Sequence, residues 1–177
     1  GDSFGAIGLS GIQEKELNLD VAKKLADTLR NYGAEILQVR DTDRDMSLTQ
    51  KRDTVRTSDA DLFISIHANA GGGGYLGVEG TSTYYNNPFW SNFADRVYKR
   101  LLELELKEFG MVGSFNYKVI RINEMPSILV EQAFLSHAED EEKLASQEFR
   151  SKMVHKIYKG ILDYLKEMNL HHKCNKN

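Results

Sequence analysis

The chain has 177 residues, enough for one domain with a hydrophobic core of its own. Hydrophobic residues make up 41% and charged residues 28%, as in ordinary globular proteins, and no apolar run approaches the roughly 20 residues that span a bilayer. A net charge of −3 without a basic stripe argues against nucleic acid as a partner.

The first elements follow from glycine content and hydrophobic spacing. Residues 1–11 hold four glycines and no hydrophobic period, which predicts a loop with tight turns. Apolar residues then recur every fourth position from Leu17 to Leu29, and Gly33 follows them. This spacing predicts a helix that ends near Gly33. Residues 34–39 are predicted to form a strand.

The middle of the chain alternates between the two kinds of element. A short polar helix is predicted around residues 49–57. Residues 62–66 form an apolar run that is typical of a strand buried on both faces. Residues 77–85 are rich in Thr and Tyr, which again favours a strand.

The second half continues this alternation. An amphipathic helix is predicted after Pro88, and strands are predicted at residues 117–122 and 127–130. A last helix is expected over residues 146–168, with its apolar residues along one stripe.

Strands that alternate with helices predict an α/β fold. We expect a single domain over residues 1–169, with a mostly parallel sheet and helices on both faces. Residues 170–177 are polar and are expected to form a flexible tail.

Two predicted strands end on a side chain that can bind a metal or move a proton. His67 follows the strand at residues 62–66, and Glu131 follows the strand at residues 127–130. Ligands of open α/β sheets gather at the carboxyl ends of the strands. A third candidate, Glu14, lies just before the first helix, at the end of the glycine-rich loop.

These side chains could belong to a hydrolytic zinc site. Such a site commonly has three His or carboxylate ligands and one water, whose pKa the metal lowers to about 7. A separate carboxylate then moves protons. His67, Glu14 and Glu131 could supply two ligands and this base, one ligand short of the usual set.

Each candidate also has a purely structural interpretation. His67 could be a hydrogen-bonded residue at a strand end, and Glu131 could be paired with a lysine or arginine. Glu14 could belong to a solvated first turn, where the helix dipole favours acidic side chains.

Five segments, in order, resemble the zinc amidases of bacterial autolysins and phage endolysins, the amidase-3 family. Gly5-Ala6-Ile7-Gly8, with Gly11, resembles the stretch after the family's Gly-His-Gly-Gly loop, and Glu14-Lys15-Glu16-Leu17-Asn18-Leu19 resembles its Glu-Lys-x-x-Asn-Leu motif. The other three segments are Val39–Asp43 with the helix at 47–52, Ala60–Ala70, and Met125–Ser136.

The resemblance implies a zinc-dependent N-acetylmuramoyl-L-alanine amidase, which hydrolyses the amide between N-acetylmuramic acid and L-alanine in peptidoglycan. It implies that Glu14 and His67 are Zn²⁺ ligands and that Glu131 is the catalytic carboxylate. The expected substrate is peptidoglycan, and the expected place of action is extracellular or in the cell wall.

Three features depart from the family pattern. The family's first zinc histidine and its strand would precede Gly1, so we expect a histidine two to four residues before it. Gln132-Ala133 stands where the family usually has Leu-Gly, which bears on the cleft beside Glu131. His137 stands where Asn is usual; we expect a surface histidine, with an additional metal ligand as the alternative.

Two other functions compete with the amidase. One is a peptidoglycan-binding or regulatory domain that has kept the fold and lost catalysis. The other is a zinc peptidase, because peptide hydrolysis needs the same chemistry.

Overall fold

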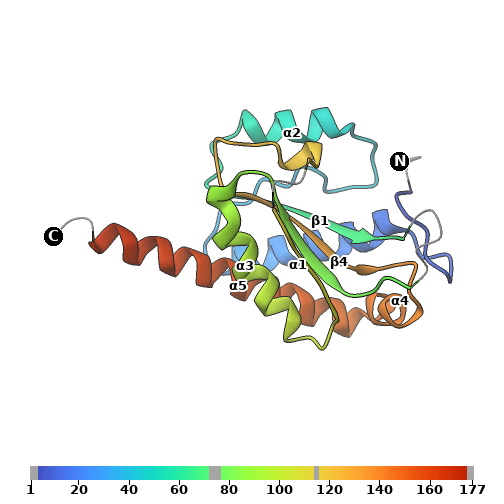
Figure 1. The fold of residues 1–177 in the computed structure, drawn as a ribbon. Helices are drawn as coiled ribbons and strands as arrows, with labels where there is room; N and C mark the ends of the chain where they lie inside the picture. Colours follow the sequence, from blue (N-terminus) through green and yellow to red (C-terminus); the bar gives the residue numbers. More distant parts are fainter. Residues whose placement is uncertain (1–3, 72–76, 114–115, 175–177) are drawn as a thin grey trace.

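The computed structural model describes residues 4–71, 77–113 and 116–174, with the backbone alone from 170 onward. The helices are α1 (Glu14–Asn31), α2 (Leu48–Arg56), α3 (Ser91–Leu102), α4 (Ala138–Ala145) and α5 (Gln147–Cys174). The strands are β1 (Phe63–Asn69), β2 (Thr81–Tyr85), β3 (Glu108–Val112) and β4 (Ser127–Phe134), and two short 3₁₀ turns are η1 (Pro88–Trp90) and η2 (Lys118–Ile120). Figure 1 shows their arrangement.

The described strands form one sheet in the order β1-β4-β2-β3. β1 pairs with β4 in parallel, β4 with β2 antiparallel, and β2 with β3 in parallel. The prediction of a mostly parallel sheet is therefore confirmed. β4 is buried along its whole length, which agrees with the apolar run at residues 128–130.

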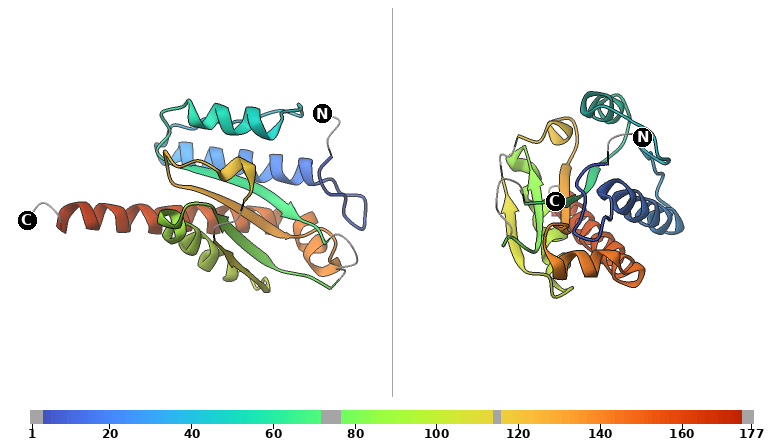
Figure 2. Two further views of the ribbon diagram at one scale, coloured as in Figure 1. Left: turned by 45° about the horizontal axis from the view of Figure 1, so that its top comes forward. Right: turned by 90° about the vertical axis from the view of Figure 1, so that its right-hand side faces the viewer.

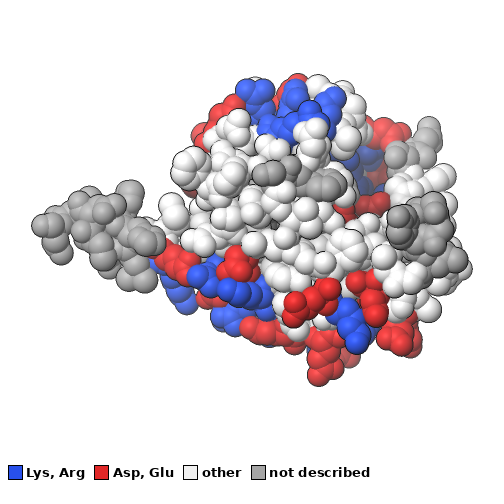
Figure 3. Space-filling view, in the orientation of Figure 1, with Lys and Arg blue, Asp and Glu red and all other residues white. Residues whose placement is uncertain are grey.

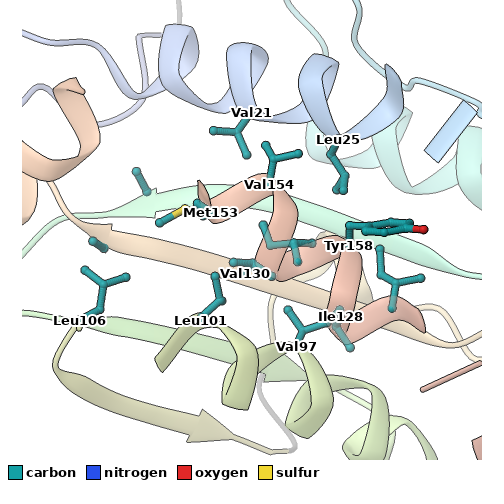
Figure 4. Packing of buried hydrophobic residues seen from close by; sticks show 14 of the residues in the cluster. Val21, Leu25, Val97, Leu101, Leu106, Ile128, Val130, Met153, Val154 and Tyr158 are labelled. Atoms are coloured by element: carbon teal, nitrogen blue, oxygen red, sulfur yellow. The ribbon is translucent and has the colours of Figure 1, made fainter. Parts of the chain in front are cut away.

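The main core lies between one face of the sheet and three helices. α1 contributes Val21 and Leu25, α3 contributes Val97 and Leu101, and α5 contributes residues such as Met153, Val154 and Tyr158. They meet Ile128 and Val130 of β4, as Figure 4 shows. The four-residue spacing in α1 thus places its apolar stripe on the sheet.

The opposite face of the sheet is covered by smaller elements. η2 packs Val119 and Ile120 against Leu129 of β4. α2 packs Val55 close to Phe63 of β1. Both faces of the sheet therefore carry helical elements, as predicted, and Figure 2 shows the layers from two sides.

Two predicted strands are wrong. Residues 34–39 form no strand because no strand of the described sheet pairs with them; half of them are exposed, with Leu37 56% exposed, and none is buried. Residues 117–122 contain the η2 turn instead, and Val119 and Ile120 are buried by packing onto a sheet face. Sequence reasoning also missed β3 and α4.

The other predicted elements are confirmed with shifted ends. α5 continues to Cys174, beyond the predicted end at residue 168, and extends past the rest of the molecule (Figure 1). The boundary between the domain and a tail stays a prediction, and residues 175–177 lie outside the described part. None of the described helices combines the length and apolarity of a membrane span.

Charged side chains are unevenly distributed on the face seen in Figure 3. Lys and Arg gather at the top of this view, where α2 lies in Figure 1, and both signs mix along the lower edge. The centre of the view is largely uncharged.

Candidate active site

His67 and Glu131 lie side by side at one edge of the sheet. They are register partners on the parallel strands β1 and β4, so both strands deliver them to the same carboxyl edge. In Figure 1 the arrowhead of β1 points toward the side of the molecule where the chain begins. This is the arrangement that the two apolar runs predicted.

Glu14 reaches this edge from the start of α1. The preceding loop folds back through a bridge between Ile7 and Gln13, and Ala6 N–H donates to Glu14 Oε2 at 2.9 Å. Gly5 is required here: its φ is +69°, and a Cβ at this position would lie 2.4 Å from Glu14 Oε2. The glycine-rich sequence therefore lets the backbone pass close to the carboxylate.

Glu14 and His67 are in direct contact, as predicted. His67 Nδ1 lies 3.0 Å from Glu14 Oε1, and because a carboxylate only accepts, Nδ1 is the donor. Burial alone would raise the pKa of Glu14. The hydrogen bond and charge of His67, together with the hydrogen bonds donated by Ala6 and Asn18, instead lower this pKa to about 2. Glu14 is thus an ionised carboxylate at neutral pH.

Glu131 has the opposite electrostatic environment. Its side chain is buried, with 6% of the residue exposed, and its Oε2 has no hydrogen-bond partner within the described residues. Burial, together with the negative charge of Glu14, raises the pKa of Glu131 to about 8. Two carboxyl groups of one site with widely separated pKa values are typical of acid–base catalysis.

The residues fit a metal ion in part. His67 Nδ1 and Glu14 Oε1 lie 3.0 Å apart, so both atoms could bind one metal ion, whose bonds to nitrogen and oxygen are about 2.0–2.2 Å long. Among the residues that the structure describes, however, no three His, Cys, Asp or Glu side chains gather to hold a metal. The assignment of Glu14 and His67 as zinc ligands stays a prediction.

His137 lies apart from this pair. It is the N-cap residue of α4, its side chain is 23% exposed, and its Nε2 lies 3.9 Å from Glu79 Oε2. It is thus half-buried, less exposed than the surface histidine that we predicted. His155, on α5, is exposed.

Sequence reasoning missed two supporting amides. Asn18 Nδ2 donates to Glu14 Oε1 at 2.8 Å, and Gln132 Nε2 donates to Asn18 Oδ1 at 3.0 Å. The four-residue spacing from Glu14 to Asn18 on a helix was a usable signal for the first contact. No local signal connects Gln132 to Asn18, which is 114 positions away.

The glycine-rich loop is also tied to α4. The backbone N–H and the hydroxyl of Ser10 each donate to Glu141 Oε1 at 2.9 Å. Glu141 is buried, with 5% of the residue exposed. One carboxylate of α4 therefore fixes the loop whose Ala6 N–H supports Glu14.

Fold and site together define an α/β enzyme domain with a carboxylate–histidine site at the carboxyl edge of its sheet. The sequence profile of the Amidase_3 family, described as N-acetylmuramoyl-L-alanine amidase, matches residues 1–163. The chain belongs to this family.

Similar proteins carry the same family name. N-acetylmuramoyl-L-alanine amidase LytC of Bacillus subtilis is 34% identical over 90% of this chain, which spans only 32% of LytC. The catalytic domain of the amidase CwlV from Paenibacillus polymyxa has a TM-score of 0.85 and 32% identity, covering 92% of this chain and 91% of that domain. The amidase AmiC2 of Nostoc punctiforme has a TM-score of 0.85 and 33% identity, covering 92% and 90%.

Proposed function

We propose that this domain is a zinc-dependent peptidoglycan hydrolase that cleaves the amide between N-acetylmuramic acid and L-alanine, acting outside the cell or in the wall. The observation that carries the proposal is the contact of Glu14 with His67 beside the buried Glu131, whose Oε2 has no hydrogen-bond partner within the described residues. Membership of the amidase family supports the choice of substrate.

Each side chain has a distinct part in this reaction. Glu14 and His67 would hold the metal, with the Ala6 N–H and the Asn18 amide fixing the Glu14 carboxylate. Bound zinc supplies Lewis acidity, which activates water and stabilises negative charge on the carbonyl oxygen. Glu131 takes a proton from the attacking water and returns it to the leaving amine of L-alanine.

The position of Glu131 suits proton transfer. Its carboxyl lies next to His67 in register and is shielded from bulk water, so the proton it takes stays close to the reacting bond. Its unpartnered Oε2 has no competing donor within the described residues. A bound cation beside it would bring its pKa down toward neutrality.

Digestion of purified peptidoglycan tests the proposal. Free L-alanine amino termini should appear while reducing sugars stay constant, a chelator should stop the release, and added zinc should restore it. Glu131→Gln should lower the rate by about 10²–10⁴-fold, whereas Glu139→Gln, on the exposed side of α4, should keep it.

Other outcomes point to the rival functions. Binding of walls without any release would indicate a catalytically inactive binding domain. Cleavage within the stem peptide, with the N-acetylmuramic acid amide intact, would indicate a peptidase.

A further inference from the structure

Gln132 occupies an unusual place for an uncharged polar side chain. It lies near the carboxyl end of β4, directly after Glu131, and is fully buried, followed by the apolar Ala133 and Phe134. β1 and β4 change register here: His67 pairs with Glu131, but Asn69 pairs with Phe134. β4 therefore has one extra residue at Gln132-Ala133, a bulge of the kind that redirects side chains near active sites.

The side chain of Gln132 points toward the start of α1. Its Nε2 donates to Asn18 Oδ1 at 3.0 Å, and Asn18 Nδ2 donates to Glu14 Oε1 at 2.8 Å. Glu14 Oε1 in turn accepts from His67. A continuous chain of hydrogen bonds thus runs from the residue after Glu131 to the Glu14–His67 pair.

The Glu14 carboxylate sets the direction of every hydrogen bond in this series. The Glu14 carboxylate can only accept, so Asn18 must present its NH₂ group to Glu14 and its carbonyl to Gln132. Gln132 must then donate, and its own carbonyl oxygen is left without a partner within the described residues. Glu14 therefore determines which way both amides face, and Gln132 holds the Asn18 amide in that orientation by donating to its carbonyl oxygen.

Stability alone does not explain this glutamine. A buried amide is unfavourable unless its polar atoms are paired, and here one of its two polar atoms has no partner in the described structure. Asn18 is likewise buried, 8% exposed, inside a helix that asparagine does not favour. The two amides instead give Glu14 Oε1 a hydrogen-bond donor that is held in one place.

We propose that Gln132 is a positioning residue for Glu14, acting through Asn18. It keeps the Asn18 NH₂ group on Glu14 Oε1 and so holds the carboxylate in the orientation that binds the metal. The inference rests on the proposed function in one respect: it takes Glu14 as a zinc ligand.

The test begins with three single variants of the full chain. Gln132→Met keeps the side-chain length and removes the amide, whereas Gln132→Glu keeps the shape and turns a donor into an acceptor. Thr83→Val is the matched control, because Thr83 is also fully buried in the sheet and its hydroxyl donates to Ala94 O, outside the chain of amides.

Zinc affinity, measured by competition with a chromophoric chelator, is the first readout. Loss of a residue that supports a metal ligand typically weakens metal binding by about 10–100-fold. We expect that loss for Gln132→Met, a larger loss for Gln132→Glu, and none for Thr83→Val. Asn18→Ala should weaken binding by the same factor, and adding Gln132→Met to it should change nothing further.

Hydrogen exchange of the Asn18 side-chain NH₂ group, followed by NMR in EDTA-treated protein, is the second readout. Gln132→Met should speed this exchange about tenfold, the equivalent of one hydrogen bond. This readout needs neither metal nor activity, so it tests the positioning even if the wild-type protein binds no zinc.

The outcomes separate the inference from the proposed function. Wild-type protein without zinc-dependent release of L-alanine termini contradicts the proposed function. Unchanged Asn18 exchange in Gln132→Met overturns the positioning role whatever the activity. If zinc binds the wild type, equal affinity in Gln132→Met, or additive losses with Asn18→Ala, overturns it as well.

Discussion

Replacing Glu131 by glutamine should make the EDTA-treated protein more stable at pH 7.5 and leave its stability at pH 5 nearly unchanged. The reason is the buried carboxyl group, whose pKa rises from its ordinary 4.5 to about 8 in the folded chain. Between these two values the folded state holds a proton that the unfolded state has lost. The free energy of unfolding therefore falls as the pH rises through this range.

The size of the effect follows from the two pKa values. At about 1.4 kcal/mol for each pH unit, ionisation of Glu131 costs about 5 kcal/mol of stability at pH values well above 8. Between pH 5 and pH 7.5 the loss amounts to about 3 kcal/mol. Glu131→Gln keeps the shape of the side chain but cannot ionise, so it should lack this loss.

Urea unfolding at pH 5, 6.5 and 7.5 measures the difference. The stability of the wild type minus that of Glu131→Gln cancels the contributions of all other groups. Glu139→Gln, which removes an exposed carboxylate of α4, is the control and should follow the wild type. Parallel curves for the wild type and Glu131→Gln would refute the reasoning and indicate that water reaches Glu131 in the folded protein.

Three further predictions concern the other end of the site, the metal and the helix packing. Because the pKa of Glu14 is lowered to about 2, its ionised form stabilises the fold above pH 4.5, and this contribution is lost as the pH falls toward 2; Glu14→Gln should therefore flatten the stability curve between pH 4.5 and 2. Zinc added to EDTA-treated protein should raise the melting temperature of the wild type more than that of His67→Ala, as followed by circular dichroism. Gly160→Ala should destabilise the fold by about 1–3 kcal/mol in urea unfolding, since a Cβ there would lie 2.6 Å from Val97 Cα on α3; an unchanged midpoint would show that α3 and α5 can separate without cost.

Much of the sheet could be predicted from the sequence because two of its strands, β1 and β4, carry a strong signal. The apolar runs before His67 and Glu131 are β1 and β4, and their parallel pairing brings both side chains to one edge. β3 was missed because it is a short outer strand with exposed residues and an internal glycine, Gly110.

The errors have a common physical origin. A short apolar segment signals burial, but the signal does not say whether the segment is buried by strand pairing or by packing onto a face. Ile120 is fully buried, as it would be in a strand, but it belongs to a 3₁₀ turn. Residues 34–39 have strand propensity and no paired neighbour in the described sheet.

The charged residues of the candidate site could be predicted from the sequence, but their amide partners could not. His67 and Glu131 stand out because ionisable groups beside apolar strands are rare without a function or a partner. Glu14 was singled out mainly by the family resemblance. Gln132 was noted only as a departure from the family pattern and Asn18 only as part of a motif, because an amide in a sequence gives no indication of which distant group it will meet. Their pairing depends on how α1 lies across the bulge of β4.

The tie between Ser10 and Glu141 has a consequence for the order in which the domain folds. The two residues are 131 positions apart, and closing so long a stretch of chain is entropically costly and slow. The bonds from Ser10 to Glu141 can form only once α4 lies at the end of β4, whereas the local contact of Ala6 with Glu14 does not depend on α4. The part of the glycine loop around Ser10 is therefore fixed late, after most of the chain between Ser10 and Glu141 has folded.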